Sequence, residues 1–353
     1  MKILITGICG FVGSQIAQHW LETYSQIQIV GIDNFSRSGS WKNRDPLIQR
    51  GCRILHGDIR NTSDLEGVGP VDFVIDAAAN ASVLAGVSGG SPSRQLIENN
   101  LLGTINLLEF CKQHRAGFIL LSTSRVYSIP PLAGLAVSTK HKAFKPDPDQ
   151  LPTGISPSGI SESFSTSAPV SLYGATKLAS EQLALEYGHA FRFPVWINRC
   201  GVMAGAGQFG RADQGIFAFW LHAWKEGRPL KYIGFDGQGS QVRDCLHPRD
   251  LIALLSQQSQ TQNDGRPQVI NVAGGVNSAM SLAQLSDWCS ERWTQRVVTI
   301  DANPRPYDLP WVVLDAGLAN IVWQWNPVTS VSQILNEIAD FADTQSDWIS
   351  QSM

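Results

Sequence analysis

The chain has 353 residues, of which 43% are hydrophobic and 16% charged, and its formal net charge is −3. This length and apolar content are enough for one large domain with an attached lobe. The charge is close to neutral and shows no long run of one sign, which argues against a nucleic-acid partner or an anionic membrane surface. No apolar run reaches the ~20 residues that a membrane-spanning helix needs.

The cysteines are scattered and form no Cys-x-x-Cys pair: they are Cys9, Cys52, Cys111, Cys200, Cys245 and Cys289. This usage favours buried, reduced thiols over disulfides or a metal site. The chain opens directly on an apolar segment at residues 2–5, which predicts a strand rather than a cleavable leader. We therefore expect a cytoplasmic protein that holds no metal.

The first half of the chain alternates apolar strand patterns with helical patterns. Strands are predicted at residues 2–6, 27–32, 52–56, 71–76, 118–122 and 194–198, and the main helices at 11–24, 99–114 and 173–191. Alternating strands and helices predict an α/β fold with a doubly wound parallel Rossmann sheet. Sheets of this kind bind ligands beyond the carboxyl ends of their strands.

The domain organisation follows from where this alternation stops. Residues 1–202 are predicted to form the dinucleotide-binding domain, and residues 203–353 mainly a smaller C-terminal substrate-binding lobe packed by tryptophans. Residues 269–272 resemble one more strand that returns to the sheet. Residues 128–170 are rich in Pro, Ser and Gly and lack a helical period, which predicts a lid-like insertion over the substrate, with a disordered connection as the alternative.

A glycine motif follows the first predicted strand, with Gly7, Gly10 and Gly13 around the start of the next helix at Phe11 and Val12. In a dinucleotide-binding turn the first glycine permits the tight turn. The second permits close approach of the pyrophosphate, and the third permits helix-to-strand packing. The phosphates then lie at a helix N-terminus, where free N–H groups favour negative charge.

An acidic residue ends the second predicted strand, about 20 residues after Gly13, as the dinucleotide fingerprint requires. Asp33, with Asn34 beside it, is expected to bind the adenine ribose. Its charge would repel a 2′-phosphate, so NAD is preferred, although Arg37 keeps NADP as a minor alternative. Asp58 and Ile59 follow the third strand and are placed to meet the adenine, but Asp58 is also typical of a simple turn after glycine.

The candidate chemistry lies in Tyr173 and Lys177, which are one helical turn apart and share a face of the predicted helix. A phenol has an ordinary pKa of about 10 and needs a nearby positive charge to act as a base near neutral pH. Thr123 and Ser124 follow a predicted strand, so their hydroxyls are expected beside the nicotinamide at the edge of the sheet. An ordinary helical pair and a polar loop remain the structural alternatives.

Several other residues are weighed between function and structure. Ala78 and Asn99 lie near the expected cofactor edge, and Asn99 is favoured as the cap of its helix. Arg243 is suited to clamp a diphosphate, although a surface ion pair explains it as well. His247 has no partner visible in the sequence, which favours a structural role.

These motifs resemble the extended short-chain dehydrogenase/reductase family, the NAD-dependent nucleotide-sugar epimerases and dehydratases. The resemblance covers nearly the whole chain and includes residues 33–34, 57–60, 76–79, 99–106 and 173–177. It implies that Tyr173 is the base, that Thr123 hydrogen-bonds the sugar hydroxyl, and that Lys177 binds the nicotinamide ribose. Asp-Glu carboxylates found in the 4,6-dehydratases are replaced here by Ser124 and Arg125, so elimination of water lacks its acid and base.

Within this family, residues 123–127, 208–215 and 241–247 are similar to the branch of CDP-paratose (CDP-tyvelose) 2-epimerases. The resemblance implies tightly bound NAD, a nucleotide-diphosphate sugar as substrate, and a homodimer formed through the helices at 99–114 and 173–191. Ser128, which stands where the family usually has Gly, and residues 304–310 depart from the usual pattern. The expected substrate-binding residues are Thr123, Ser124, Arg125, Arg199, Gln208, Arg211 and Arg243.

Two alternatives to a 2-epimerase stay open. A UDP-hexose 4-epimerase would use the same Thr, Tyr and Lys, because the reacting carbon depends on how the sugar lies over the nicotinamide. A non-catalytic NAD-binding sensor would use the same fold, since fold alone does not determine function.

Overall fold

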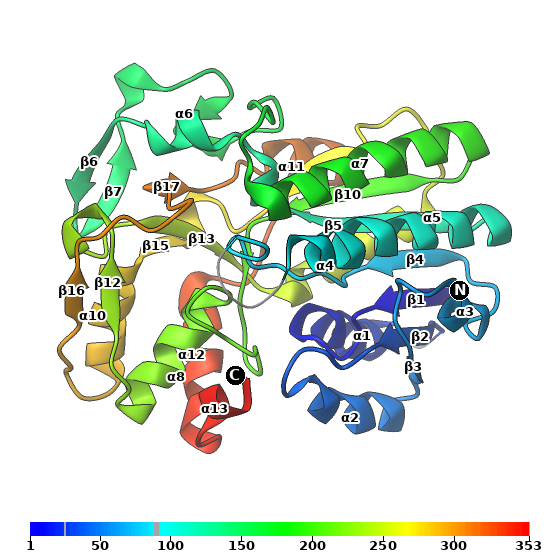
Figure 1. Ribbon diagram of the computed structural model, residues 1–353, viewed down its shortest axis with the longest axis horizontal. Helices are drawn as coiled ribbons and strands as arrows, with labels where there is room; N and C mark the ends of the chain where they lie inside the picture. The colour runs from blue at the N-terminus through cyan, green and yellow to red at the C-terminus, as the bar shows by residue number, and fades with distance from the viewer. Residues whose placement is uncertain (25, 88–91, 353) are drawn as a thin grey trace.

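The computed structural model describes residues 1–24, 26–87 and 92–352. Its centre is a parallel sheet in the order β14-β10-β5-β4-β1-β2-β3 (Figure 1). The strands are β1 (Lys2–Thr6), β2 (Gln28–Asp33), β3 (Arg53–His56), β4 (Phe73–Asp76), β5 (Gly117–Thr123), β10 (Val195–Cys200) and β14 (Val269–Val272). The prediction of a doubly wound parallel α/β sheet is confirmed.

Helices cover both faces of this sheet, and the strand side chains alternate between them. Ile3 and Ile5 belong to the core under α1 (Phe11–Thr23), α9 (Leu251–Gln260) and α11 (Gly317–Trp323). Leu4 belongs to the opposite core, under α3 (Thr62–Glu66), α5 (Gly103–His114) and α7 (Ser171–Phe191). Because both faces are buried, central strands such as β1 and β5 contain continuous apolar runs rather than alternating apolar and polar residues.

The order of the strands places a crevice beside β1. From β1 the chain runs outward through β2 and β3, with α2 (Arg44–Gln49) between them, and then crosses back to β4 on the other side of β1. Parallel sheets bind ligands at such a switch point, because the connecting loops diverge there. The glycine turn leaves β1 at this position.

The second predicted helix begins earlier than the sequence indicated. α4 (Ser93–Ile97), the π-helical η2 (Glu98–Leu102) and α5 follow one another without a break. Asn99 therefore lies inside a helix, and the expectation that it caps one is wrong. Leu102 stands at the N-cap of α5 with helical dihedral angles, so the sequence signal of a capping residue was misleading.

The insertion at 128–170 has secondary structure of its own. It contains α6 (Ile129–Ala133), a hairpin of β6 (Val137–Lys140) with β7 (Ala143–Pro146), and a shorter hairpin of β8 (Ile155–Ser156) with β9 (Gly159–Ile160). Lys142 pairs with Asp287, and Phe144 N–H donates to Ser240 O, which attaches the first hairpin to the lobe. Strands this short carry no readable period, so the sequence did not reveal them.

The lobe contains a small sheet of β11 (Val202–Met203), β13 (Val242–Leu246), β15 (Ala279–Ser281) and β17 (Trp311–Val312), and a separate pair of β12 (Lys231–Ile233) with β16 (Thr299–Asp301). Its helices are α8 (Ile216–Glu226), α10 (Leu282–Arg292), α12 (Val331–Thr344) and α13 (Trp348–Ser352). Trp220 and Trp224 pack this lobe as predicted. Trp323 and Trp325 instead join the core of the large domain, where Trp323 meets Trp196 edge to face.

Two expectations about the chain's environment can be compared with this fold. All six cysteines are buried and unpaired with one another. Within the described part of the chain, no helix has the length and apolar character to cross a bilayer.

Candidate active site

The glycine turn after β1 has the backbone shape of a phosphate cradle. Gly7 has a φ of +60°, which side chains rarely tolerate, and a Cβ there would lie 3.0 Å from the Cα of Ala78. A Cβ at Gly13 would lie 2.4 Å from the carbonyl oxygen of Gly7. Gly10 is the N-cap of α1 and has no side chain to cover the N–H groups that follow. These residues therefore fit the pyrophosphate of a dinucleotide at a helix N-terminus.

Asp33 lies at the end of β2 and faces this turn. Its carboxylate accepts hydrogen bonds from the N–H groups of Cys9 (2.9 Å) and Phe35 (2.8 Å). Burial raises the pKa of Asp33, and these backbone donors offset part of that effect. Asp33 therefore lies beside the glycine turn, and its contact with the ribose stays a prediction.

The loop after β3 is held together by Asp58. Its oxygens accept hydrogen bonds from Arg60 (2.7 Å) and from the Asn34 amide (2.9 Å). Burial opposes ionisation of Asp58, but these hydrogen bonds outweigh it and lower its pKa to about 2. Asp58 and Asn34 therefore connect the loops that follow β3 and β2. Asp58 has the structural role of a turn residue, and its contact with the adenine stays a prediction.

The apolar members of the predicted cofactor set form the walls of this region. Phe11 and Ile59 are buried, each with 9% of its surface exposed. Phe11 packs near Gly205, and Ile59 packs against Gly103 at the start of α5. Val12 borders the core under α1, and Ala78 borders the opposite core.

Arg37 does not lie free beside Asp33. Its guanidinium donates to the Gln214 side chain (3.1 Å) and to the Phe209 carbonyl, on the segment between β11 and α8. Burial is the main cause that lowers its pKa, to about 10, followed by the charge of Arg211. Engaged in this way, Arg37 joins the cofactor domain to the lobe, which removes the reason for keeping NADP as an alternative.

Tyr173 and Lys177 lie on the first turns of α7, turned inward. Only 6% of Tyr173 and 2% of Lys177 are exposed. Burial raises the pKa of Tyr173 to about 12, and a hydrogen bond with the Thr123 side chain acts in the opposite direction. Thr123 ends β5, so the carboxyl edge of the sheet and the start of α7 present one hydroxyl pair to the crevice.

Lys177 lies near two carboxylates, Asp76 and Glu181, that were not predicted as its partners. Burial lowers its pKa, and the nearby charges of Asp76 and Glu181 act to raise it. Asp76 ends β4 and accepts hydrogen bonds from Thr6 (2.8 Å) and Thr104 (3.0 Å). The charge of Asp76 at the end of β4 thus favours the charged form of buried Lys177.

Asn100, rather than Asn99, connects the helices to this site. Its amide accepts from the Asn80 N–H (2.8 Å) and donates to the Asn80 carbonyl (3.1 Å) and the Thr176 hydroxyl (3.3 Å). It is buried in the π-helical turn η2, whereas Asn99 is partly exposed. A π-helical turn often accompanies a functional site, but nothing in the local sequence distinguishes the two asparagines.

A group of arginines gathers where the lobe meets the crevice. Arg125 on η3 (Ser124–Val126) is close enough for its charge to act on Arg243 and Arg305. Arg243 donates to Asp308 (3.2 Å) and to the Leu309 carbonyl (2.9 Å). Arg243 therefore pairs with Asp308, and the charges of Arg125 and Arg305 nearby leave an excess of positive charge that suits a diphosphate.

Arg305 and Asp308 were missed by sequence reasoning, which treated residues 304–310 only as a departure from the family pattern. Tyr307, between them, offers its carbonyl to Arg125 (3.4 Å). These residues are far from Thr123 and Tyr173 in the chain, and the small sheet of the lobe brings them there through β17. Only the packing of the lobe reveals them.

Arg199 is not placed to bind substrate. It lies in β10 with its guanidinium on the buried carboxylate of Glu181 (2.7 Å), which also accepts from Ser122 (2.5 Å). Burial opposes the charge of Arg199, but Glu181 outweighs it and raises the pKa of Arg199 above its ordinary value. The geometry therefore assigns Arg199 to the core, because its charge is already neutralised there.

The segment of residues 208–215 lies against both sides of the crevice. Gln208 donates to the Met203 carbonyl (2.9 Å). Asp213 accepts a hydrogen bond (2.6 Å) from the hydroxyl of Ser82, which lies in the loop after β4. Arg211 and Gln214 form an isolated backbone bridge that shapes the turn. With Arg37 on its other side, this segment joins the loops after β2 and β4. We refer to residues 208–215 as the bridging loop.

His247 has partners that the sequence did not show. Its Nδ1 accepts the Arg249 N–H (3.0 Å), and its Nε2 lies 3.2 Å from a carboxylate oxygen of Glu337. Those contacts connect the end of β13 to α12. They support the structural interpretation of His247.

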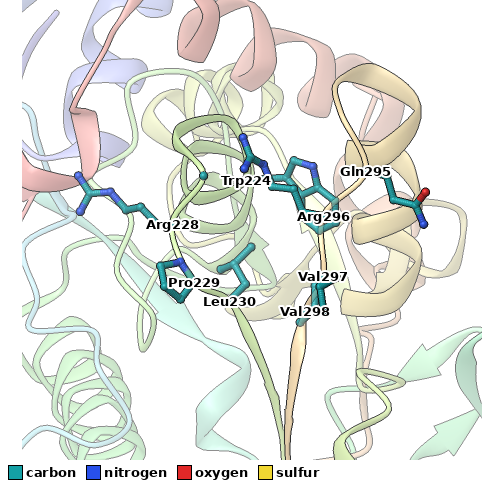
Figure 2. Close-up of a pocket in the computed structure, with 9 residues that line it drawn as sticks. Trp224, Arg228, Pro229, Leu230, Gln295, Arg296, Val297 and Val298 are labelled. Carbon is teal, nitrogen blue, oxygen red and sulfur yellow. The ribbon is translucent and has the colours of Figure 1, made fainter.

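A hollow in the lobe lies away from this site (Figure 2). It measures about 310 Å³ and lies between the end of α8 and residues 295–298, with Trp224, Arg228 and Arg296 among its lining residues. Neither the glycine turn nor Thr123, Tyr173 or Lys177 lines it. It is therefore separate from the candidate active site.

A Rossmann sheet with this glycine turn, and a buried tyrosine and lysine facing the crevice, defines an NAD-dependent α/β enzyme. Residues 3–273 match the model of the "NAD dependent epimerase/dehydratase family", and the chain belongs to that family. The family is named for NAD-dependent enzymes, so the comparisons support an enzyme rather than a non-catalytic NAD-binding sensor.

The curated relatives act on nucleotide sugars. The chain is 28% identical to CDP-paratose 2-epimerase of Salmonella typhi, over 98% of this chain and 100% of the relative. It is 24% identical to UDP-glucuronate 4-epimerase of Thermodesulfobacterium geofontis, over 96% and 95%. The comparisons thus support a nucleotide-sugar epimerase or dehydratase.

Solved structures agree with this. The UDP-glucuronic acid 4-epimerase of Bacillus cereus, in complex with UDP-glucuronic acid and NAD, has a TM-score of 0.74 and 26% identity, covering 98% of this chain and 99% of that chain. UDP-glucose 4-epimerase of Thermotoga maritima has a TM-score of 0.74 at 21% identity, with 98% and 99% covered, and shares the fold. NAD is therefore the cofactor to be considered at the glycine turn.

Proposed function

We propose that this enzyme inverts one carbon of a nucleotide sugar by transient oxidation. The observation that carries the proposal is the pair of buried Tyr173 and buried Lys177 on α7, with Thr123 at the end of β5 acting to lower the pKa of the phenol, at the edge of the sheet that also carries the glycine turn. A phenolate held by a hydroxyl and a cation is suited to remove the proton of a sugar hydroxyl. Tyr173 can act as the base only if its phenol points into the protein, and its side chain is buried.

The residues of the crevice fit NAD, whose nicotinamide accepts a hydride from the sugar carbon and returns it to the opposite face. Gly7, Gly10 and Gly13 make room for the pyrophosphate, and Asp33 is placed for the ribose diol. Tyr173 takes the hydroxyl proton as the C–H bond is broken and gives it back when the bond re-forms. The cycle consumes no cofactor, so NAD is expected to stay bound.

The substrate diphosphate is proposed to lie against Arg125, Arg243 and Arg305, of which Arg243 forms an ion pair with Asp308. Gln208 and Arg211 on the bridging loop are proposed to contact the nucleotide or sugar, and Ser124 the sugar. The insertion at 128–170 is proposed to cover the substrate and exclude water. A site that holds the reacting atoms about 3–3.5 Å apart supplies much of the rate enhancement.

The preferred substrate class is a CDP-linked deoxyhexose inverted at C2, as in CDP-paratose. Support comes from the full-length relative of that activity and from the three similar stretches at 123–127, 208–215 and 241–247. A UDP-hexose or UDP-hexuronate inverted at C4 is the second candidate, favoured by the UDP-glucuronate 4-epimerases among the relatives and structures. The same Thr, Tyr and Lys serve either carbon.

The experiment supplies purified holoenzyme with CDP-paratose, UDP-glucose and UDP-glucuronate separately and assigns the inverted carbon by NMR. We expect inversion at C2 of the CDP sugar, with no deuterium incorporated at that carbon in heavy water. Deuterium at the inverted carbon would indicate proton abstraction and overturn the oxidation route. Tyr173→Phe is expected to lower kcat by about 10²- to 10⁴-fold, and unchanged activity would remove Tyr173 from its role.

A homodimer through α5 and α7 is proposed as well. These helices lie side by side on one face of the sheet (Figure 1), and apolar side chains on them and on the preceding turns are exposed, among them Ile97, Leu102, Leu172 and Phe191. Exposed apolar patches on a helix pair are typical of an interface. Light scattering should give twice the chain mass, and Leu102→Glu should shift it toward the monomer.

A further inference from the structure

The short helix α13, near the end of the chain, is anchored to the lobe by its own side chains. It lies beside α8 and α12 (Figure 1), and its first residue, Trp348, has only 5% of its surface exposed. The indole ring meets Phe341 of α12 edge to face (ring centroids 4.8 Å apart) and lies nearly parallel to His222 of α8 (6.3 Å). Ile349 is buried in the same core. α13 is therefore a fixed part of the lobe surface.

The same indole contacts the bridging loop in two ways. Its Nε1–H donates a hydrogen bond to the carbonyl oxygen of Gln208 (2.8 Å), and its ring stacks on that of Phe209 (centroids 5.2 Å apart, planes at 18°). Phe209 is buried as well, with 3% exposed. A hydrogen bond and an aromatic stack both depend on orientation, so together they fix the first two residues of the bridging loop against Trp348.

The other side of this contact is formed by the cofactor domain. A Cβ at Gly39 would lie 2.7 Å from the ring of Phe209 and 3.1 Å from the carbonyl oxygen of Gln351 on α13. On the next turn, η1 (Ser40–Asn43), the Lys42 ammonium lies 5.2 Å from the centroid of the Trp348 ring and hydrogen-bonds the Gln351 side chain. Phe209 is therefore enclosed between α13 and the segment that follows β2.

The turn η1 is in turn attached to the glycine turn. The Asn43 amide donates to the carbonyl oxygen of Cys9 (2.9 Å) and to the hydroxyl of Ser14 on α1 (3.2 Å). The contacts of α13 with η1 thus join the end of the chain to the part of the fold that is shaped for the cofactor.

The position of the bridging loop depends on contacts of this kind. Within the loop the backbone pairs with itself, Arg211 with Gln214, which shapes the turn but does not attach it to the crevice. The attachments come from side chains around the loop, including Arg37, Ser82 and Trp348. Of these three, Trp348 is the one that belongs to the lobe and contacts the beginning of the loop.

We propose that Trp348 is a positioning residue for substrate binding: α13 clamps the beginning of the bridging loop so that Gln208 and Arg211 are held at the crevice. The proposal rests on the proposed function, in which these two residues contact the nucleotide or sugar. It gives a role to a helix outside residues 3–273, the part that matches the family model. Loss of the clamp should weaken substrate binding and leave the chemical step nearly unchanged, because the catalytic residues lie on β5 and α7.

Limited trypsin digestion of the full-length NAD-bound protein tests the clamp without any substrate. Arg211 is the only Lys or Arg in the bridging loop, so cleavage after it gives pieces 1–211 and 212–353, which mass spectrometry identifies. We expect Trp348→Ala to speed this cleavage at least about tenfold, because a hydrogen bond and an aromatic stack each change a local opening equilibrium by a few-fold to about tenfold. Trp348→Phe keeps a ring but loses the N–H, so it should be a few-fold faster than the wild type, and it provides the comparison should the alanine variant not fold.

Two controls separate the clamp from a general loosening of the fold. Cleavage after Lys140, on the exposed hairpin of the insertion, should proceed at the wild-type rate in every variant. Trp293→Ala removes another tryptophan of the lobe, one that hydrogen-bonds Asp343 on α12 (3.0 Å), and should change cleavage after Arg211 by no more than about twofold. Unchanged cleavage after Arg211 in the Trp348 variants, or equal acceleration after Lys140 or in Trp293→Ala, would overturn the proposal.

Kinetics separate this inference from the proposed function. With an active sugar nucleotide, Trp348→Ala should raise KM about tenfold while kcat stays within about twofold of the wild type, the pattern of lost substrate binding. An unchanged KM together with faster cleavage after Arg211 would show that the clamped loop does not bind substrate, which would also overturn the proposal. If no sugar nucleotide is turned over, the proposed function fails, while the cleavage rate still decides whether Trp348 holds the bridging loop.

Discussion

Thr123, at the end of β5, acts to lower the pKa of the Tyr173 phenol on α7. The two residues belong to separate elements, and the insertion at 128–170 lies between them in the chain. The effect of Thr123 opposes that of burial, which raises the pKa of the phenol. Thr123 therefore contributes to how easily Tyr173 ionises.

Thr123→Val should impair the reaction by removing the hydroxyl that would hydrogen-bond the Tyr173 phenolate. A hydrogen bond to a charged group contributes about 1.5–3 kcal/mol, so kcat should fall by roughly 10- to 150-fold. The acidic limb of the kcat profile should move to higher pH, because the phenol loses a group that lowers its pKa. Thr123→Ser keeps the hydroxyl and should retain most of the activity, whereas equal losses in both variants would contradict this assignment.

The pH dependence of the wild type follows from the raised pKa of Tyr173. Because the base must be ionised, kcat should increase with pH across the neutral range, about tenfold per unit, until the pH reaches the midpoint of the phenol in the NAD-bound enzyme. The ordinary phenol pKa is about 10, and burial raises that of Tyr173 to about 12. The folded state thus keeps a proton that the unfolded state loses, so the stability from this group is present below pH 10 and is lost above it.

Urea unfolding from pH 8 to 11 measures that loss. Tyr173→Phe has no ionisable group at this position, so its stability should decrease less steeply above pH 10 than that of the wild type. Parallel curves for the two proteins would show that the phenol is not perturbed by the fold.

Gly13→Ala should abolish NAD retention. The added methyl would lie 2.4 Å from the Gly7 carbonyl oxygen, closer than any stable contact, so the turn must move. We expect purified protein without bound NAD and without the increase in Tm that NAD gives the wild type. Gly67→Ala is the control, because the nearest atom to its Cβ is Leu55 Cδ1 at 3.9 Å. An NAD content unchanged in Gly13→Ala would contradict the cradle.

Glu181→Gln should destabilise the fold rather than weaken substrate binding. It leaves the buried Arg199 guanidinium without a countercharge, and breaking such a pair costs about 3–5 kcal/mol. Urea unfolding should show this loss, while KM for the sugar nucleotide stays within about twofold of the wild type. The double variant Glu181→Gln with Arg199→Met should recover part of the stability. A large rise of KM in Arg199→Met would instead restore the substrate role that the sequence predicted.

Ser82→Ala should speed the release of NAD. It removes the hydrogen bond to Asp213 (2.6 Å) that attaches the bridging loop to the loop after β4. Exchange of bound NAD for labelled NAD should become several-fold faster, because the bridging loop would lose its contact with the loop after β4 while keeping that with Arg37. Ser82→Thr keeps the hydroxyl and should exchange at the wild-type rate. Equal rates in all three proteins would show that the bridging loop does not limit release.

The local sequence by itself determined the strands of the large sheet and the glycine turn that precedes α1. The strand at residues 269–272 appears in the structure with the same limits, and the glycine turn precedes α1 as expected. Such features are local, because a buried parallel strand needs a continuous apolar run and a phosphate turn needs residues without side chains. Tyr173 and Lys177 could be paired from helical spacing for the same reason.

Only the tertiary structure decided which charges meet. Arg199 was expected at the substrate, but β10 and α7 bury it against Glu181. Arg125 and Arg305 come together because the lobe folds back through β17. Arg37, which was expected near the ribose, instead contacts the bridging loop. A side chain's charge is visible in the sequence, but its effect depends on the distance to other charges and on desolvation, which are set by elements far apart in the chain.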